Sequence, residues 1–239
     1  KNFESILLTG ATGYLGVHLT DELLKQTSAS LYLIIRAKSN DEAEIRLKKM
    51  LDFYFGNDYY QKHMHRINIL SGDLAKENIG LPDNKYHELS ACVDCIINSA
   101  AIVKHFGNVT EFLDVNVKGP ERLLHFAQKR RKKEVFHIST MSVVAGEILD
   151  NKPMLFTEVK KDINHIFDNV YIRTKKESEK IVIDWRKQGL NTTVFRTGML
   201  MFHSRTGQFQ QNIDENAFYR FLSSLLRLGC APDVMLRNL

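Results

Sequence analysis

Residues 9–16 read Thr9-Gly10-Ala11-Thr12-Gly13-Tyr14-Leu15-Gly16, and this glycine-rich stretch decides the fold. It lies between an apolar run that favours a strand and a stretch with leucines at helical spacing. Glycines at such a junction permit a tight turn and close approach of the backbone to a pyrophosphate, and the following helix offers unpaired N–H groups to it. A glycine pattern in a loop is often only a turn, but directly after the first strand it predicts dinucleotide binding. The predicted cofactor-binding residues of this loop are Thr9, Gly10, Thr12, Gly13, Tyr14, Leu15 and Gly16.

Outward from this loop, apolar runs alternate with amphipathic stretches, the pattern of βαβ units around a parallel sheet. We expect strands at residues 5–9, 31–36, 67–71, 95–98, 134–139 and 192–196, and helices at 14–26, 43–55, 109–129, 169–188 and 216–228. The expected fold is α/β, with a Rossmann-like doubly wound parallel sheet and helices on both faces. Residues 1–200 would form the NADP-binding domain, and residues 201–239 the start of a smaller, incomplete C-terminal substrate-binding subdomain.

Composition excludes several classes of protein. In 239 residues, 44% are hydrophobic and only 17 are Gly or Pro (13 and 4), which excludes disordered and collagen-like chains. No apolar run is long enough to span a membrane, and we expect no signal peptide before the first strand. Three cysteines cannot form a disulfide framework, so we expect a cytoplasmic protein with no membrane partner.

The net charge of +5 owes much to a basic run at residues 129–133. Such a run is typical either of a nucleic-acid patch or of a solvated helix end whose cations complement the helix dipole. No stacking aromatic side chains are interleaved with it, which favours the helix end. We therefore expect no nucleic-acid partner.

The end of the second strand predicts which cofactor is bound. NAD-binding folds place an acidic residue there to hold the ribose 2′-hydroxyl, whereas an Arg suits the 2′-phosphate of NADP. Here Arg36 ends the strand and Lys38 follows, with no carboxylate at the strand end. The pair predicts NADPH, although two exposed positions of this kind can also be ordinary surface cations.

Further cofactor contacts are expected where the third and fourth strands end. Asp73 could accept from the adenine amino group or close an ordinary Asx turn, and Leu74 follows it. The small residues Ser99, Ala100 and Ala101 would let the cofactor lie close over the sheet edge, or would serve only packing.

A Tyr-x-x-x-Lys pair, Tyr171 and Lys175, carries the predicted chemistry at the start of the fourth expected helix. This spacing puts both side chains on one helix face. A phenol acts as an acid or base near neutrality only with help from a nearby cation, which Lys175 would supply. Such a pair is common on surfaces, but the glycine loop upstream favours catalysis. Thr140, with Ser142 as second choice, would hold the substrate carbonyl oxygen.

Two clusters resemble metal sites without completing one. Cys92 and Cys95 have zinc-like spacing, but no further ligands complete a set of four. His63 and His65 would diverge on a helix. We therefore expect no metal site.

The glycine loop, Thr140, Tyr171 and Lys175 together resemble the extended short-chain dehydrogenase/reductases. The amino-acid sequence resembles the terminal thioester reductase domains of nonribosomal peptide synthetases even more closely, and this resemblance covers nearly the whole sequence. The motifs that carry it are Thr9 to Gly16, Ile-Ile-Arg-Ala ending at Ala37 with Glu42 and Arg46 following, Asn98-Ser-Ala-Ala, Asn116-Val-Lys-Gly, Ile-Ser-Thr-Met-Ser-Val-Val-Ala-Gly from Ile138, and Arg196-Thr-Gly.

The resemblance implies NADPH-dependent release of a peptidyl or aminoacyl group from the phosphopantetheine thiol of an upstream peptidyl carrier domain, in secondary metabolite biosynthesis. Hydride would attack the thioester carbonyl, Tyr171 would supply a proton with Thr140 holding the oxygen, and the hemithioacetal would collapse to an aldehyde and a thiol. Some relatives reduce the aldehyde further to an alcohol. Lys175 would position the cofactor and tune Tyr171, and Asn116 would support the hydrogen-bond network beside the cofactor. The chain would be a monomeric module of a larger synthetase.

Two other functions are compatible with the sequence. One is an extended short-chain reductase that acts on acyl-CoA, aldehydes or ketones. The other is a non-catalytic NADP-sensing regulatory module, which would not need Tyr171 and Lys175 at their spacing.

Overall fold

A computed structural model describes residues 2–104, 107–144, 147–148, 157–158, 165–166 and 169–230. The chain divides into two compact units, Lys1–Leu200 and Met201–Leu239.

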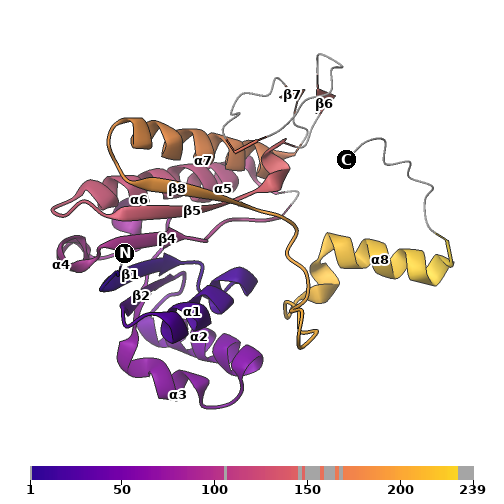
Figure 1. Ribbon diagram of the computed structural model, residues 1–239, viewed down its shortest axis with the longest axis horizontal. Coiled ribbons are helices and arrows are strands. Elements are labelled where there is room, and N and C mark those ends of the chain that lie inside the picture. Colours follow the sequence, from indigo (N-terminus) through magenta and orange to yellow (C-terminus); the bar gives the residue numbers. More distant parts are fainter. Residues whose placement is uncertain are drawn as a thin grey trace. The chain divides into compact units, whose positions relative to one another are not determined.

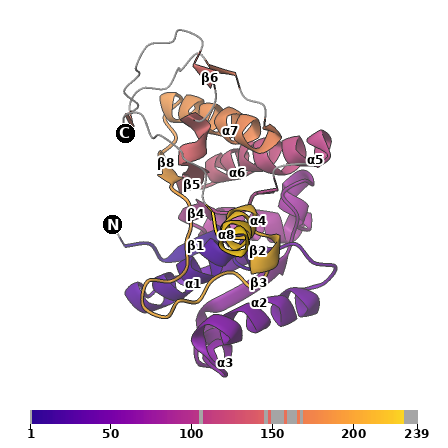
Figure 2. The ribbon, with the colours of Figure 1, turned by 90° about the vertical axis from the view of Figure 1, so that its right-hand side faces the viewer.

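The first unit is built on a six-stranded parallel sheet with the strand order β3-β2-β1-β4-β5-β8 (Figure 1). Its strands are β1 (Ser5–Thr9), β2 (Ser30–Ile35), β3 (Ile67–Ser71), β4 (Cys95–Asn98), β5 (Glu134–Thr140) and β8 (Thr192–Thr197). Because β1 pairs with both β2 and β4, the strand order reverses at β1, as the end-on view in Figure 2 shows. In open α/β sheets, ligands bind outside the carboxyl ends of the strands at such a reversal. The order confirms the predicted doubly wound, Rossmann-like sheet.

Helices connect these strands. They are α1 (Tyr14–Gln26), α2 (Asn40–Phe55), α3 (Tyr59–His63), α4 (Asp83–Cys92), α5 (Val109–Leu113), α6 (Gly119–Gln128) and α7 (Val170–Lys187). The unit also contains the short helical segments η1 (Met64–Arg66), η2 (Glu77–Gly80), η3 (Asp114–Lys118) and η4 (Met141–Val144), and an antiparallel pair of β6 (Glu147–Ile148) and β7 (His165–Ile166).

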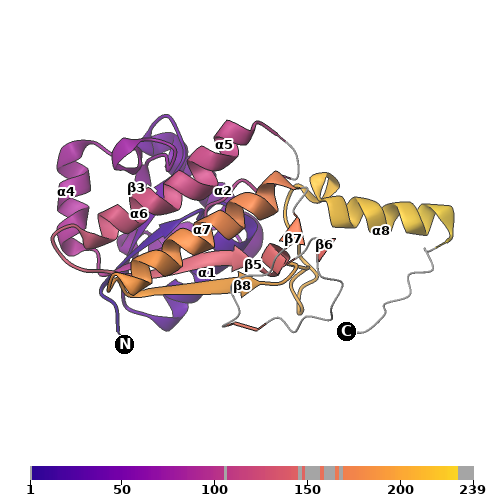
Figure 3. The same cartoon turned by 90° about the horizontal axis from the view of Figure 1, so that it is seen from above.

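Two hydrophobic cores hold the sheet between its helices, one on each face. Leu7 of β1 belongs to the core that includes side chains of α4, α6 and α7, whereas Ile6 and Leu8 belong to the core of α1 and α2. The division follows from the alternation of side chains along a strand. Burial on both faces explains why the strands read as continuous apolar runs, and each fully buried aliphatic side chain contributes roughly 1.5–3 kcal/mol. Figure 3 shows α6 and α7 side by side on one face.

The expected single helix over residues 109–129 is interrupted. The structure has α5, then a π-helical segment, η3, and then α6. A π-helical turn takes in one more residue than an α-helical turn and often occurs at functional sites. Asn116, a predicted site residue, lies in the middle of this segment.

The second unit is small and is dominated by α8 (Ala217–Leu228), which follows the 3₁₀ turn η5 (Ile213–Glu215). Asn216 caps α8, because its Oδ1 accepts hydrogen bonds from the N–H groups of Phe218 and Tyr219 at 3.1 and 3.2 Å. The helix ends at Gly229 in the left-handed conformation (φ +64°), a common helix terminus. No helix among the described residues of either unit is both long and apolar enough to cross a bilayer.

Candidate active site

The glycine loop between β1 and α1 is shaped by close backbone contacts. Gly10 has φ +77°, and a Cβ atom there would lie 2.8 Å from the backbone nitrogen of Ala100. A Cβ atom on Gly16 would overlap the carbonyl oxygen of Gly10. Both positions therefore require glycine for the turn and for the packing of α1 on the strand.

The first turn of α1 fits a phosphate group. Gly13 is the N-cap residue, and among the described residues no side chain caps this turn and no acidic side chain lies in it. The N–H groups at the start of the helix and the helix dipole therefore favour an anion here. The predicted residues Tyr14 and Leu15 lie in this same turn, and Thr12 directly precedes the N-cap residue.

The ends of β1 and β4 are tied together beside the loop. Thr9 donates to Asn98 Oδ1 at 2.7 Å, and the N–H of Ala100 donates to Thr9 Oγ1 at 3.2 Å. Ser99, Ala100 and Ala101 follow β4 and are partly exposed. The structure thus brings these predicted residues to the carboxyl edge where the strand order reverses.

The end of β2 presents exposed cations, as predicted. Arg36 and Lys38 are both exposed. Arg46 of α2 was not predicted as a site residue, yet its guanidinium donates to the carbonyl of Arg36. Ser39 caps α2 by accepting from Glu42 N–H at 3.2 Å, which helps to hold the helix against this strand end. A second guanidinium therefore stands at the predicted 2′-phosphate position.

At the end of β3 the structure shows an ordinary turn. The Oδ1 atom of Asp73 accepts from the N–H of Ala75 at 2.9 Å, which is the Asx turn that the sequence left open. Leu74 is 6% exposed and belongs to the hydrophobic core. A role of either residue in adenine binding stays a prediction.

Thr140 and Tyr171 meet across the end of β5. Asn169 caps α7, with Oδ1 accepting from Tyr171 N–H at 2.8 Å. The Tyr171 phenol lies beside the Thr140 hydroxyl. Burial raises the pKa of Tyr171, and the nearby Thr140 hydroxyl acts in the opposite direction. Ser142, the second choice, lies on the other side of Thr140, with its Oγ 3.2 Å from Thr140 Oγ1.

Lys175 lies one turn further along α7 and is almost fully buried. Its Nζ donates to the carbonyl oxygen of Ile138 at 2.6 Å, two residues before Thr140 on β5. Four residues of a helix and two residues of a strand span similar lengths, about 6 and 6.6 Å. Tyr171 can therefore lie beside Thr140 while Lys175 contacts Ile138. Burial lowers the pKa of Lys175 to about 8, against the opposing effect of the Glu179 carboxylate. That carboxylate is itself paired with Arg196 at 2.8 Å.

Asn116 bridges the segment after β4 and helix α7. Its Oδ1 accepts from Ile102 N–H at 2.8 Å, and its Nδ2 donates to Ile102 O at 3.0 Å and to Thr174 Oγ1 at 3.2 Å. The amide is buried and uses both of its protons within the protein. Its direct contact with a cofactor stays a prediction.

The basic run at residues 129–133 is not solvated throughout, which corrects the expectation for Lys133. This residue is 1% exposed, and its Nζ donates to the carbonyl oxygens of Ser90, Lys129 and Arg131 at 2.7–2.9 Å. Burial lowers the pKa of Lys133 to about 8. The ammonium therefore satisfies carbonyls at the ends of α4 and α6.

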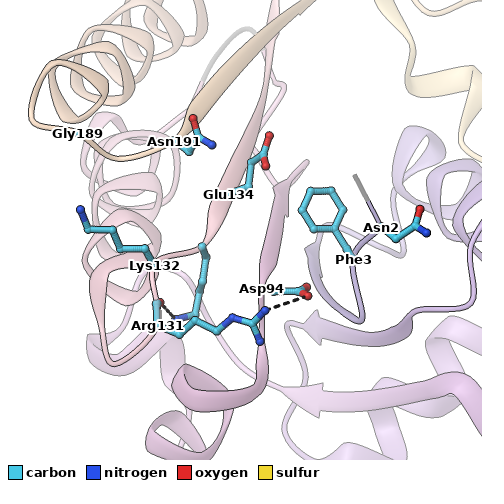
Figure 4. A pocket seen from close by; sticks show the side chains of 9 residues that line it. Asn2, Phe3, Asp94, Arg131, Lys132, Glu134, Gly189 and Asn191 are labelled. Carbon is cyan, nitrogen blue, oxygen red and sulfur yellow. Dashed lines mark hydrogen bonds and ion pairs between the residues drawn. The ribbon is translucent and has the colours of Figure 1, made fainter.

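Beside this run lies a cavity of about 370 Å³ at the amino ends of the strands (Figure 4). Its charged lining includes Asp94, Arg131 and Glu134, and Arg131 is paired with Asp94 at 3.6 Å. It lies at the sheet edge opposite the glycine loop, so it is separate from the predicted site.

The two metal-like clusters serve packing and stacking. Cys95 is buried in the core, and the ring of His63 stacks on Tyr59 with centroids 4.6 Å apart. Within the described ranges, no group of three His, Cys, Asp or Glu side chains is arranged to hold a metal ion.

The family of the chain agrees with this geometry. Residues 8–238 match the NAD-binding family that is described as Male sterility protein. The chain belongs to this family. Membership confirms the predicted nicotinamide dinucleotide-binding fold of a reductase.

Similar proteins include peptide synthetases and their reductase domains. A linear gramicidin synthase from Brevibacillus parabrevis is 32% identical over 98% of this chain and 4% of its own length. The terminal R domain of the myxalamid PKS-NRPS pathway has a TM-score of 0.88 at 29% identity, over 98% of this chain and 58% of that chain. A thiolation-reductase di-domain of an archaeal nonribosomal peptide synthetase has a TM-score of 0.86 at 29% identity, over 99% and 50%. This chain of the NAD-binding family thus spans less than two thirds of each, and the resemblance to terminal reductase domains is confirmed.

Proposed function

We propose that this chain is the cofactor-binding and catalytic part of an NADPH-dependent thioester reductase. It would release a peptidyl or aminoacyl group from a carrier domain as an aldehyde, or as an alcohol after a second reduction. The observation that carries the proposal is the hydrogen bond of Lys175 to Ile138 O at the end of β5, with Tyr171 one helical turn away beside Thr140, at the edge that also bears the glycine loop. A dinucleotide-binding module without chemistry would need neither the contact of Tyr171 with Thr140 nor that of Lys175 with Ile138.

The residues of the chain fit a nicotinamide dinucleotide with a 2′-phosphate. The uncapped turn after Gly13 would take the pyrophosphate, and the guanidinium groups of Arg36 and Arg46, with Lys38, would take the 2′-phosphate. When bound, the reduced dinucleotide supplies a hydride. Lys175 would hold the ribose next to the nicotinamide while its charge favours the phenolate of Tyr171 once the proton has left.

The side chains at the end of β5 would bind the carbonyl oxygen of the thioester. The hydroxyls of Thr140 and Tyr171 donate to the carbonyl oxygen and stabilise negative charge as the carbonyl carbon is reduced. Burial keeps Tyr171 protonated at neutral pH, so it can transfer its proton to that oxygen. The resulting hemithioacetal then breaks its C–S bond, and the hydroxyl proton passes to sulfur, which gives an aldehyde and a free thiol.

The remaining parts of the proposal concern context. The thiolation-reductase architecture of a similar protein supports an upstream carrier domain as the partner. We assign the second unit to substrate binding and the whole to a monomeric module. Cys92, Cys95 and Cys230 form no disulfide with one another, which favours a reducing compartment such as the cytoplasm.

The test is NADPH oxidation by the full-length protein with its carrier domain loaded with an acyl thioester. Free acid, acyl-CoA and unloaded carrier serve as substrate controls. Tyr171→Phe should lower turnover by about 100-fold or more while NADPH affinity stays unchanged. Tyr86→Phe, at a buried tyrosine of α4, is the matched control and should keep full activity. Equal turnover in Tyr171→Phe would contradict the catalytic assignment, and oxidation only with acyl-CoA would assign a different substrate class.

A further inference from the structure

A chain of buried polar side chains crosses the sheet beneath the glycine loop. It starts at Thr9, which accepts from Ala100 N–H and donates to Asn98 Oδ1 at 2.7 Å. Asn98 Nδ2 lies 3.1 Å from His137 Nδ1, and His137 Nε2 lies 3.1 Å from Ser178 Oγ. All four side chains are at most 2% exposed. This hydrogen-bonded chain of side chains therefore runs from β1 through β4 and β5 to α7.

The direction of the hydrogen bonds fixes the state of His137. Because the oxygen of Asn98 accepts from Thr9, its NH₂ group faces His137 and donates to Nδ1. The proton of the neutral ring then lies on Nε2 and is donated to Ser178. Burial, and next the charge of Lys175, lower the pKa of His137 well below its usual value. The imidazole is thus neutral and held in one tautomer.

The end of the chain lies next to the catalytic lysine. Ser178 is three residues after Lys175 on α7, and His137 is directly before Ile138, whose carbonyl oxygen accepts from Lys175 Nζ. Two adjacent residues of β5 therefore hold two adjacent turns of α7, one through a side chain and one through the backbone. The opposite end of the chain lies at Thr9, which precedes Gly10, and at Ala100, whose backbone touches Gly10.

We infer that His137 is a positioning residue that locks α7 onto the cofactor-binding edge of the sheet and so sets where Lys175 and Tyr171 stand relative to the dinucleotide. The inference rests on the proposed function, since it concerns the placement of the same catalytic groups. His137 does not itself reach the reacting atoms. Its role is to transmit the position of the glycine loop to the catalytic helix through two hydrogen bonds.

A double-mutant cycle on NADPH affinity tests the transmission without any turnover. Thr9→Val removes the hydroxyl at one end of the chain, and Ser178→Ala removes it at the other. If the hydrogen-bonded side chains from Thr9 to Ser178 act as a unit, the loss of one terminal hydroxyl already disrupts the unit. Loss of the second hydroxyl then lowers NADPH affinity by less than it does in the wild type. The double variant should then bind NADPH at least about threefold more tightly than the product of the two single effects predicts.

Ser90→Ala provides the matched control for Ser178→Ala. Ser90 is a fully buried serine of α4 whose hydroxyl donates to His87 O at 2.8 Å, outside the chain. Its effects should multiply with those of Thr9→Val. Thr9→Ser keeps the hydroxyl and should show the same coupling to Ser178→Ala as Thr9 does, which separates the hydrogen bond from loss of packing.

Nitrogen-15 NMR of His137 provides a second measurement that needs no variant to fold. We expect a neutral ring with the proton on Nε2 that does not titrate between about pH 6 and 8. Independent effects of Thr9→Val and Ser178→Ala, or a proton on Nδ1, would overturn the inference. If the protein reduces no thioester but the effects of Thr9→Val and Ser178→Ala on NADPH affinity are still coupled, the proposed function alone is refuted.

Discussion

Replacing Asn116 by alanine would test how the π-helical segment is linked to the catalytic helix. The substitution removes the partners of Ile102 N–H and Ile102 O, which lie 2.8 and 3.0 Å from the amide. An unsatisfied buried backbone group costs about 1–3 kcal/mol. Ile102 is only half-buried, so we take the lower end for each group and expect unfolding to become easier by about 2–3 kcal/mol.

The assay is urea-induced unfolding followed by circular dichroism, with the free energy of unfolding extrapolated to water. Asn68→Ala is the matched control, because Asn68 is exposed and makes one long hydrogen bond, 3.4 Å, to Leu31 O. Its effect should stay within about 0.5 kcal/mol. Asn116→Asp should not restore stability, because a carboxylate cannot donate to Ile102 O or to Thr174. A loss in Asn116→Ala as small as that in Asn68→Ala would refute the bridging role.

Two further predictions concern the cofactor and pH. Arg36→Ala should weaken NADPH binding about tenfold or more and leave NADH binding unchanged, because only NADPH carries the 2′-phosphate. Fluorescence titration measures both affinities, and Lys48→Ala, at an exposed cation of α2, is the control. Equal losses for both cofactors would make Arg36 structural. Lys175, with its pKa lowered to about 8, is an ammonium below that pH and loses its charge above it, so kcat/KM should fall as the pH rises through about 8. A flat profile to pH 9.5 would contradict an active role for that charge.

The strands were predictable from the sequence because their signal is local. The central strands β1, β2 and β4 are mostly buried on both faces, so a continuous apolar run marks each without knowledge of the partner strand. The glycine loop and the spacing of Tyr171 and Lys175 are equally local features, and the structure places the loop between β1 and α1 and the pair in the first turns of α7. Within the six-stranded sheet only the ends of β2, β5 and β8 differ, by one residue, whereas the short pair of β6 and β7 was not predicted.

The features that the sequence did not reveal depend on distant partners. Asn116 and Ile102 are joined only in the fold, so the change from α-helix to π-helix between them leaves no periodic signal. The burial of Lys133 depends on the carbonyl of Ser90, 43 residues earlier. The chain through His137 needs the pairing of β4 with β5. Helix α4 was missed because it presents few buried apolar residues to the core.

Because Lys133 is buried, chemical labelling of its amine can report local opening of the structure around it. At about pH 8 roughly half of its amine is unprotonated, a form that acylating reagents attack readily, whereas burial keeps such reagents away. Lys129 and Lys132, on the same run, are exposed and would be labelled at once. The rate at which Lys133 acquires a label would therefore report how often the junction between α6 and β5 opens.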